Sequence, residues 1–313
     1  MNDEKIAFVF PGQGSQSVGM GRALAEEFPS ANDIFKQADE ILGISLSHIA
    51  WDGADDSLDD TVNTQPAIFT HSVAVLSVLR QLNLDLIPSF VAGHSMGELS
   101  ALVAAGSLSF ADGLNLVRMR GELMKRAGEL NPGGMAAVMG LDIPQVEQLC
   151  TQASSTAEIV QVANDNCPGQ VVISGSNAAL DRVQPLLSQA GARRVIRLAV
   201  SIAAHSPFMS TAQCDFNTAV ASTPLRSPFI PTIGNVTAKP LVNVDDIRKD
   251  LENQLTHRVR WTESIQAMIS DGVTEFIEIG NGSVLGGLIK RIDRSVMTTS
   301  LGTPNDFQAL MKR

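Results

Sequence analysis

The sequence predicts an α/β fold with a largely parallel sheet. Short apolar runs typical of buried strands alternate with stretches of helical period, and this alternation favours parallel strands joined by helices. The strand-like runs lie at 6–10, 90–92, 136–139, 170–173, 195–200, 230–233 and 275–279. The helical stretches lie at 66–82, 109–127, 143–153, 176–190, 206–221 and 262–271. The length of 313 residues allows one large core with a modest additional unit.

The segment 129–200 differs from the rest of the chain. After the breaker residues 131–134, the expected elements follow in the order β-α-β-β-α-β, which is the order of ferredoxin-like folds. We therefore expect residues 129–200 to form a ferredoxin-like subdomain. It would be inserted into a larger α/β unit made of residues 1–128 and 201–313.

Composition and charge exclude several classes of function. The formal net charge of −10 gives the chain no general attraction to nucleic acid or anionic membranes. Cys150, Cys167 and Cys214 match no metal-ligand spacing and are expected to be reduced thiols. The charged start at 1–5 is not typical of a signal peptide, and no apolar run reaches the roughly 18 residues of a membrane span. We expect a cytoplasmic protein without a metal site.

The run Gly93-His94-Ser95-Met96-Gly97 is the strongest local sign of chemistry. It follows a short apolar strand and precedes a good helix former, which is the context of a nucleophile elbow. Such a turn requires glycine on either side and lifts the serine hydroxyl off the sheet. It also directs the backbone N–H of Met96 at an oxyanion formed there. The alternative is a glycine-rich turn with an incidental serine. Ser95 is the predicted nucleophile.

A serine nucleophile needs a base, and His205 is the best candidate among the five histidines. It follows the strand-like run that ends at Val200 and precedes a helix start. This places it at the carboxyl end of a strand, where reactive groups gather in parallel sheets. His71 has apolar helical neighbours and is expected in the core, and His94 should point away from the hydroxyl of Ser95.

Arg120 lies on the apolar side of a predicted helix. Its neighbours three and four residues away are all apolar, namely Leu116, Val117, Leu123 and Met124. A buried guanidinium is costly unless it meets an anion. An internal aspartate or glutamate could supply that anion. In the functional interpretation the anion arrives as a substrate carboxylate, which the two parallel N–H groups of arginine match.

Several motifs occur in the order found in malonyl-CoA:acyl-carrier-protein transacylases, and the chain resembles this family over essentially its whole length. The motifs are Phe10-Pro11-Gly12-Gln13-Gly14-Ser15-Gln16, Thr64-Gln65-Pro66-Ala67, Gly93-His94-Ser95-Met96-Gly97-Glu98, Arg118-Met119-Arg120-Gly121, Asn164-Asp165-Asn166-Cys167-Pro168-Gly169-Gln170, Ala204-His205-Ser206, and Gln254-Leu255 through Val259-Arg260-Trp261. The resemblance implies an α/β-hydrolase-like core with the nucleophile elbow and the ferredoxin-like insertion.

The resemblance also implies roles for single residues. Ser95 would carry the acyl ester, His205 would be the general base, and Arg120 would hold the malonyl carboxylate. The backbone N–H groups of Gln13 and Met96 would form the oxyanion hole. The residues that orient the base or line the cleft would be Gln254, whose segment replaces a triad acid with a main-chain carbonyl, and Gln65, Asn164 and Asn166.

The implied activity is ping-pong transfer of a malonyl group from malonyl-CoA to the phosphopantetheine thiol of an acyl carrier protein. Both thioesters are substrates, so no cofactor is expected, and the family suggests a monomer. Because acyl carrier proteins are acidic, a local basic rim is expected on the cleft. The candidate pairs are Arg193-Arg194, Lys125-Arg126 and Lys290-Arg291.

Two departures from the family pattern leave alternatives open. Residues 202–204 before His205 leave open a methyl-branched malonyl unit, and thus a methylmalonyl-type or trans-acting polyketide acyltransferase. The run Gly280-Asn281-Gly282 replaces Gly-Pro-Gly and is expected to affect only a turn. The other rival functions are a serine thioesterase or hydrolase with the same elbow, and a non-catalytic module that binds acyl carrier protein within a larger synthase.

Overall fold

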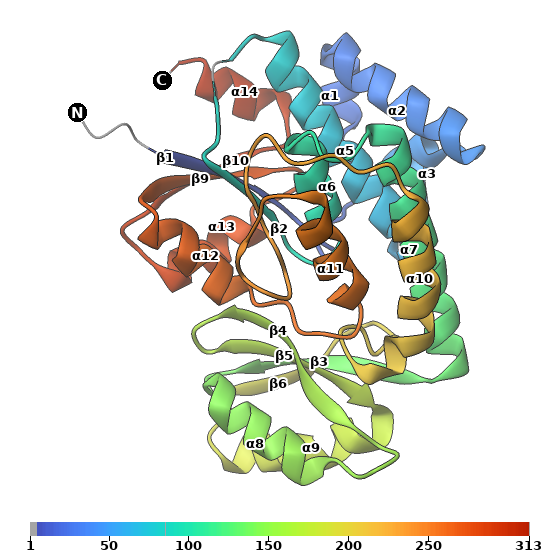
Figure 1. Cartoon of the computed structure of the whole chain (residues 1–313), viewed down its shortest axis with the longest axis vertical. Helices are drawn as coiled ribbons and strands as arrows, with labels where there is room; N and C mark the ends of the chain where they lie inside the picture. The colour runs from blue at the N-terminus through green and yellow to red at the C-terminus, as the bar shows by residue number, and fades with distance from the viewer. Residues whose placement is uncertain (1–4, 85, 313) are drawn as a thin grey trace.

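The computed structural model describes residues 5–84 and 86–312, which form two sheets flanked by helices (Figure 1). The strands are β1 (Lys5–Phe10), β2 (Phe90–Gly93), β3 (Gly133–Met139), β4 (Val160–Cys167), β5 (Gln170–Ser176), β6 (Arg194–Arg197), β7 (Thr232–Ile233), β8 (Pro240–Leu241), β9 (Val273–Ile279) and β10 (Met297–Leu301). The charged residues 1–4, from which we expect the absence of a signal peptide, lie outside the described part.

The helices connect these strands and cover their faces. They are α1 (Arg22–Glu27), α2 (Pro29–Leu42), α3 (Leu46–Asp52), α4 (Asp55–Asp59), α5 (Thr61–Gln81), α6 (Gly97–Ala104), α7 (Phe110–Leu130), α8 (Ile143–Ala153), α9 (Asn177–Gln189), the short 3₁₀ helix η1 (Pro207–Met209), α10 (Ser210–Ser222), α11 (Val244–Gln254), α12 (Trp261–Ser270), α13 (Val284–Ile292) and α14 (Pro304–Leu310). Within the described ranges, no helix is both long and apolar enough to cross a membrane.

The larger sheet confirms the predicted α/β fold. Its strand order is β10-β9-β1-β2-β7-β8, and every neighbouring pair is parallel except β7 with β8. Successive side chains of a strand point to opposite faces. In β1, Ala7 and Val9 therefore pack against the side covered by α12 and α13. Phe8 and Phe10 pack against the opposite layer, which includes α1, α2, α5 and α6. Both faces are buried, as a parallel sheet requires.

The segment 133–197 forms the smaller sheet, which is antiparallel and lies below the larger one in Figure 1. Its elements follow in the order β3, α8, β4, β5, α9, β6, and its strand order is β4-β5-β3-β6. Alternate residues of β3 separate its two faces. Ala136 and Val138 pack with α8 and α9. Met135 and Ala137 point to the other side, where they line a cleft between the two sheets.

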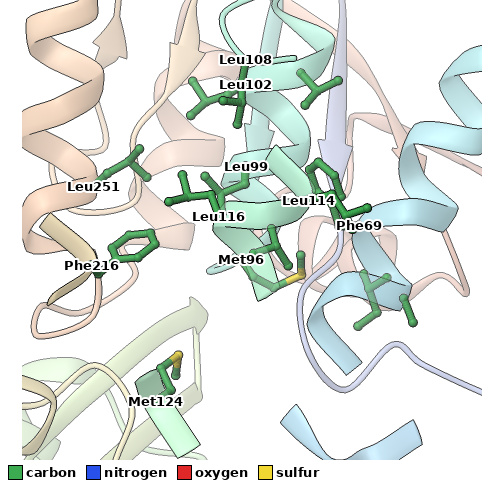
Figure 2. Packing of buried hydrophobic residues seen from close by; sticks show 14 of the residues in the cluster. Phe69, Met96, Leu99, Leu102, Leu108, Leu114, Leu116, Met124, Phe216 and Leu251 are labelled. Atoms are coloured by element: carbon green, nitrogen blue, oxygen red, sulfur yellow. The ribbon is translucent and has the colours of Figure 1, made fainter. Parts of the chain in front are cut away.

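A further apolar cluster supports the start of α6 and thereby the elbow before it. Figure 2 shows Met96 and Leu99 packed among side chains of neighbouring helices, including Phe69 of α5 and Leu116 of α7. All four are buried. Since each buried side chain of this size contributes about 1.5–3 kcal/mol relative to its exposed state, this end of α6 is firmly held.

The predicted elements differ from the observed ones at the sheet edges and in several of the helices. The strand expected at 195–200 ends at Arg197, and residues 198–200 line the cleft instead. The edge strands β8 and β10 were not predicted, because one is two residues long and the other, Met297–Leu301, has three central hydroxyl side chains. Helices α1 to α4, α11, α13 and α14 were also not predicted, since most are short.

Candidate active site

The turn between β2 and α6 requires glycine at both ends. A Cβ on Gly93 would lie 1.9 Å from the carbonyl carbon of Gly97, and one on Gly97 would lie 2.3 Å from the carbonyl oxygen of Phe10. Between them, Ser95 has φ 52°, a left-handed conformation that non-glycine residues seldom adopt. Such strain is typical of functional sites. The turn presents the half-buried Ser95 side chain to the cleft.

Asn235, which the sequence analysis missed, holds this strained turn from the far side. Its side-chain oxygen accepts the backbone N–H of Ser95 at 2.7 Å, and its side-chain nitrogen donates to the carbonyl of Gly93 at 2.8 Å. Asn235 is buried just after β7, the strand that pairs with β2. No local pattern could have pointed to it, because the contact joins residues 140 positions apart.

The structure brings His205 to Ser95. The hydroxyl of Ser95 lies 2.9 Å from Nε2 of His205, within hydrogen-bond distance. The opposite ring atom, Nδ1, lies 2.8 Å from the carbonyl oxygen of Gln254 and 3.0 Å from that of His257. Both carbonyls only accept hydrogen bonds, so Nδ1 carries the hydrogen and Nε2 keeps a lone pair for the hydroxyl. His205 also has a left-handed backbone, with φ 57°.

Burial and charge keep the His205 side chain neutral. Burial, followed by the positive charge of Arg120, lowers the pKa of His205 to about 3. The hydrogen bonds to the carbonyls of Gln254 and His257 act in the opposite direction without reversing the shift. Within the described ranges no carboxylate hydrogen-bonds to His205, so main-chain carbonyls occupy the place of a triad acid. At neutral pH the ring can therefore accept a proton from Ser95.

Arg120 is only 1% exposed, and its hydrogen-bond partners in the described part of the chain are neutral. Its Nη1 donates to Oε1 of Gln65 at 2.7 Å and its Nε to Oε1 of Gln254 at 3.0 Å. Its Nη2 donates to the Ser95 hydroxyl at 3.0 Å. No aspartate or glutamate in the described part of the chain forms a direct ion pair with it, which disfavours the internal-partner alternative.

The charge of Arg120 persists despite this burial. Burial lowers its pKa to about 10, and the charge of Glu98 acts in the opposite direction. The side chain is thus positive at neutral pH. A buried positive charge is unfavourable unless an anion offsets it, and this one lies beside Ser95, where an anionic group of a ligand could meet it.

A chain of amide and hydroxyl groups links Arg120 to the loop after β1. Gln65 accepts from Arg120 and donates to Oγ1 of Thr61 at 3.1 Å. Thr61 in turn donates to Oε1 of Gln13 at 2.7 Å. On the other side of Arg120, the Gln254 amide donates to the carbonyl of Ser95 at 3.2 Å and to a carboxyl oxygen of Glu98. These contacts fix Arg120 relative to both ends of the cleft.

The predicted site residues converge on one cavity of about 460 Å³. Those that line it are Gln13, Ser95, Met96, Arg120, Asn164, Asn166 and His205. Gln65 and Gln254 lie behind Arg120 instead. Among the described residues, no protein acceptor is found for the backbone N–H of Gln13 or of Met96, so both donors are available to a ligand.

His94, His71 and the turn at residues 280–282 also make specific contacts. Nε2 of His94 hydrogen-bonds to Oδ1 of Asn166 at 2.8 Å, and His71 is buried against the carbonyl of Gly302. The expectation that Asn281 affects only a turn was wrong. Its side-chain nitrogen donates to the carbonyl of Ser15 at 2.6 Å and to Oγ of Ser17 at 2.9 Å, so it fastens the loop that carries Gln13. A proline could donate neither bond.

Known proteins are similar to this chain over nearly its whole length. Residues 7–302 match the acyl transferase domain family. The chain is 42% identical over 304 residues to the malonyl CoA-acyl carrier protein transacylase of Bacillus subtilis, covering 97% of this chain and 95% of that protein. It is similar to the crystal structure of an acyl carrier protein S-malonyltransferase from Vibrio cholerae, with 39% identity, a TM-score of 0.94 and coverage of 98% and 100%.

A second similar structure contains a carrier protein. It is described as a type II PKS acyl-carrier protein in complex with its malonyl-transacylase. The identity is 37% and the TM-score 0.94, with 99% of this chain and 100% of that chain covered.

Proposed function

The chain belongs to the malonyl CoA-acyl carrier protein transacylases of the acyl transferase family, and we propose that it carries the malonyl group as an ester on Ser95. It moves malonyl from coenzyme A to the phosphopantetheine thiol of an acyl carrier protein. His205 is the general base, Arg120 binds the malonyl carboxylate, and the remaining predicted site residues position these groups.

One observation carries this proposal. An uncompensated guanidinium donates to the nucleophile itself, since Nη2 of Arg120 lies 3.0 Å from Oγ of Ser95. Malonyl has its carboxylate only two bonds from the carbonyl carbon that Ser95 attacks. An acyl group on Ser95 therefore places its carboxylate at Arg120, where it gains charge-assisted hydrogen bonds. An acyl group without a carboxylate leaves the buried charge unmet.

In the first half-reaction, the hydroxyl of Ser95 attacks the thioester carbonyl of malonyl-CoA. His205 takes the hydroxyl proton at Nε2 as the oxygen–carbon bond forms. The backbone N–H groups of Gln13 and Met96 stabilise the resulting oxyanion, and loss of one such donor typically costs roughly 10²–10³ in rate. The carbon–sulfur bond then breaks. His205 returns the proton to the sulfur, so coenzyme A leaves as the thiol and malonyl remains on Ser95.

The second half-reaction reverses these steps with a different thiol. His205 removes the proton from the phosphopantetheine thiol of the carrier, and the sulfur attacks the malonyl ester. The same two backbone N–H groups hold the oxyanion. The bond to Ser95 breaks and its oxygen regains the proton from His205. Arg120 keeps the acyl group in one orientation throughout, which restricts the direction of attack.

The acceptor that the acyl-enzyme uses distinguishes a transferase from a hydrolase. We expect malonyl-CoA alone to yield a single turnover of free coenzyme A and slow hydrolysis, and added acyl carrier protein to give continuous transfer. A stopped assay with and without the carrier measures both products. Hydrolysis that is fast and unaffected by the carrier would assign the site to a thioesterase instead.

The pH dependence of the reaction is expected to report the charge of Arg120. The base works only when neutral, and the pKa of His205 in the free enzyme is lowered from 6.5 to about 3. The acid limb of kcat/KM should therefore lie well below the ordinary histidine value. A bound carboxylate offsets the charge of Arg120 and raises the His205 pKa. The acid limb of kcat then moves to higher pH.

Steady-state rates with malonyl-CoA over the acid range measure both limbs. Coincident limbs at the ordinary histidine pKa would contradict this account of the electrostatics. A folding control at each pH, by circular dichroism, separates titration of the base from acid unfolding.

We further propose the domain boundaries, the oligomeric state and the cellular location of the protein. Residues 1–128 and 201–313 are assigned to an α/β-hydrolase-like core and residues 129–200 to a ferredoxin-like insertion. The order β4-β5-β3-β6 of the second sheet supports this division.

We also assign a cytoplasmic monomer that needs no cofactor. Its Cys150, Cys167 and Cys214 are free, which is the state expected in a reducing compartment.

For docking of the acidic carrier protein we assign Lys290-Arg291 rather than the other two basic pairs. Arg291 donates to the side chain of Gln170, which lines the cleft. The charge of Arg291 thus lies next to a residue that lines the cleft. In the Lys125-Arg126 pair, by contrast, Lys125 is paired with Asp60 at 2.6 Å. Positive charge beside the cleft would speed the encounter with the acidic carrier protein.

A further inference from the structure

We propose that Glu98 and Asp250 hold one proton between them, carried on Glu98, and that the resulting neutral acid positions Gln254 while leaving the charge of Arg120 free for the substrate. This inference rests on the proposed role of Arg120 as the receptor of the malonyl carboxylate. Glu98 is a positioning residue in this account, because it reaches Arg120 through Gln254 and touches no reacting atom.

The surroundings of Glu98 favour a proton on its side chain. Glu98 lies in the first turn of α6, one turn after Ser95, and is 0% exposed. Its Oε2 accepts from the amide of Gln254. Its Oε1 is buried without any hydrogen-bond donor among the described residues. A carboxylate oxygen without a donor is unfavourable in such a place, whereas a protonated oxygen becomes a donor itself.

Asp250 of α11 supplies the acceptor, because its side chain hydrogen-bonds to that of Glu98. It accepts the backbone N–H of Val236, and the backbone N–H and hydroxyl of Thr237, each at 3.2 Å. Three donors stabilise a charged carboxylate. Glu98, with one donor, is the member of the pair that takes the proton. Two adjacent carboxyl groups in unequal surroundings divide in this way.

The direction of the Glu98 titration agrees with this geometry. Burial, followed by the charge of Asp250, raises the pKa of Glu98 well above its usual range. The Gln254 amide and, more weakly, the backbone of Asn235 oppose the shift. Among the described residues, no donor forms a hydrogen bond with Oε1 itself.

The neutral state of Glu98 matters because of what it faces. When ionised, Glu98 is the acid whose charge acts on Arg120 of α7. An ionised Glu98 would compensate Arg120 from behind and weaken its hold on a substrate carboxylate. A neutral Glu98 still accepts the Gln254 amide. Gln254 is then oriented with its oxygen toward Nε of Arg120, and its backbone carbonyl remains on His205.

Difference infrared spectroscopy tests the proton without any substrate, so it stands apart from the proposed function. The folded wild type should show the C=O stretch of a protonated carboxylic acid at neutral pH, and Glu98→Gln should lose that band. Glu278→Gln is the matched control. Glu278 is also a buried carboxyl, with a pKa raised to about 7 by burial, but it hydrogen-bonds to the backbone at the start of α13, away from the site.

The two bands are expected to disappear at different pH values, which keeps the test valid if Glu98→Gln fails to fold. The Glu278 band should disappear from the wild type as the pH rises above about 7, and the Glu98 band should persist. Wild-type protein without a protonated carboxyl band above that pH would overturn the proposal. A band that survives in folded Glu98→Gln would overturn it as well.

Activity then tests whether a negative charge at Glu98 is needed. The amide in Glu98→Gln can donate to Asp250 and accept from Gln254, as the protonated acid does. Malonyl transfer and the preference for malonyl over acetyl should therefore stay within about threefold of wild type, which corresponds to less than one hydrogen bond. A folded variant with the preference lost would show that a negative charge at Glu98 is needed, and the proposal would fall while Ser95 chemistry remained intact.

Discussion

Ser95→Ala is expected to abolish the malonyl-enzyme and to lower malonyl transfer by roughly 10⁴–10⁶-fold, the range seen when a serine nucleophile is removed. The reason is that Ser95 is the hydroxyl held between His205 and Arg120, at 2.9 and 3.0 Å. Alanine keeps the turn but leaves no atom to form the ester. Covalent labelling with radiolabelled malonyl-CoA, followed by denaturation, measures the loss directly.

Ser100→Ala provides the matched control for this experiment. Ser100 is buried in α6, the helix that follows Ser95, and its hydroxyl has no hydrogen-bond partner among the described residues, so its removal should cost little stability. Label and transfer should stay near wild type in this variant. Residual stoichiometric label on Ser95→Ala would mean that another side chain is the nucleophile.

Arg120→Ala is expected to lower kcat/KM for malonyl transfer by roughly 10²–10⁴-fold while sparing or improving transfer of acetyl. A carboxylate on a guanidinium gains two charge-assisted bonds of about 1.5–3 kcal/mol each, which together correspond to that factor. Acetyl has no carboxylate and gains nothing from the charge. Alanine also leaves Gln65 and Gln254 without their donor, but this loss acts on both substrates. The ratio of the two rates is therefore the informative quantity.

Arg118→Ala controls for removal of a positive charge from α7. Arg118 pairs with Glu122 at 2.6 Å on the outer face of the same helix, and the ratio should not change when it is replaced. Equal losses of malonyl and acetyl transfer in Arg120→Ala would mean that Arg120 only supports the fold of the site.

The parts of the site that could be predicted from sequence are those with a local physical cause. Gly93 and Gly97 around Ser95 predict a turn too tight for side chains, and the structure shows contacts of 1.9 and 2.3 Å at their missing Cβ positions. Arg120 among apolar helical neighbours predicted burial, and the side chain is 1% exposed. The alternation of strands and helices predicted the parallel sheet in the same way.

The parts that could not be predicted depend on contacts between distant segments or on backbone atoms. Asn235 holds the elbow from 140 residues away. The carbonyl of His257 that hydrogen-bonds to His205 is a backbone group, so no side-chain pattern indicates it. Asp250 lies on a polar-looking helix and meets Glu98 only once α11 packs beside α6. The role of Asn281 has no local sign either, because its partners in the Gln13 loop lie 266 and 264 positions earlier.

The measurement that tests the central claim most directly is intact-mass analysis after brief incubation with an equimolar mixture of malonyl-CoA and acetyl-CoA. A positive charge buried beside the nucleophile and lacking an internal anion should select the acyl group that brings one. The wild type is expected to retain one malonyl group, mapped by peptide analysis to Ser95. Retention of acetyl in equal or greater amount, or a malonyl mass on any other residue, would contradict the account.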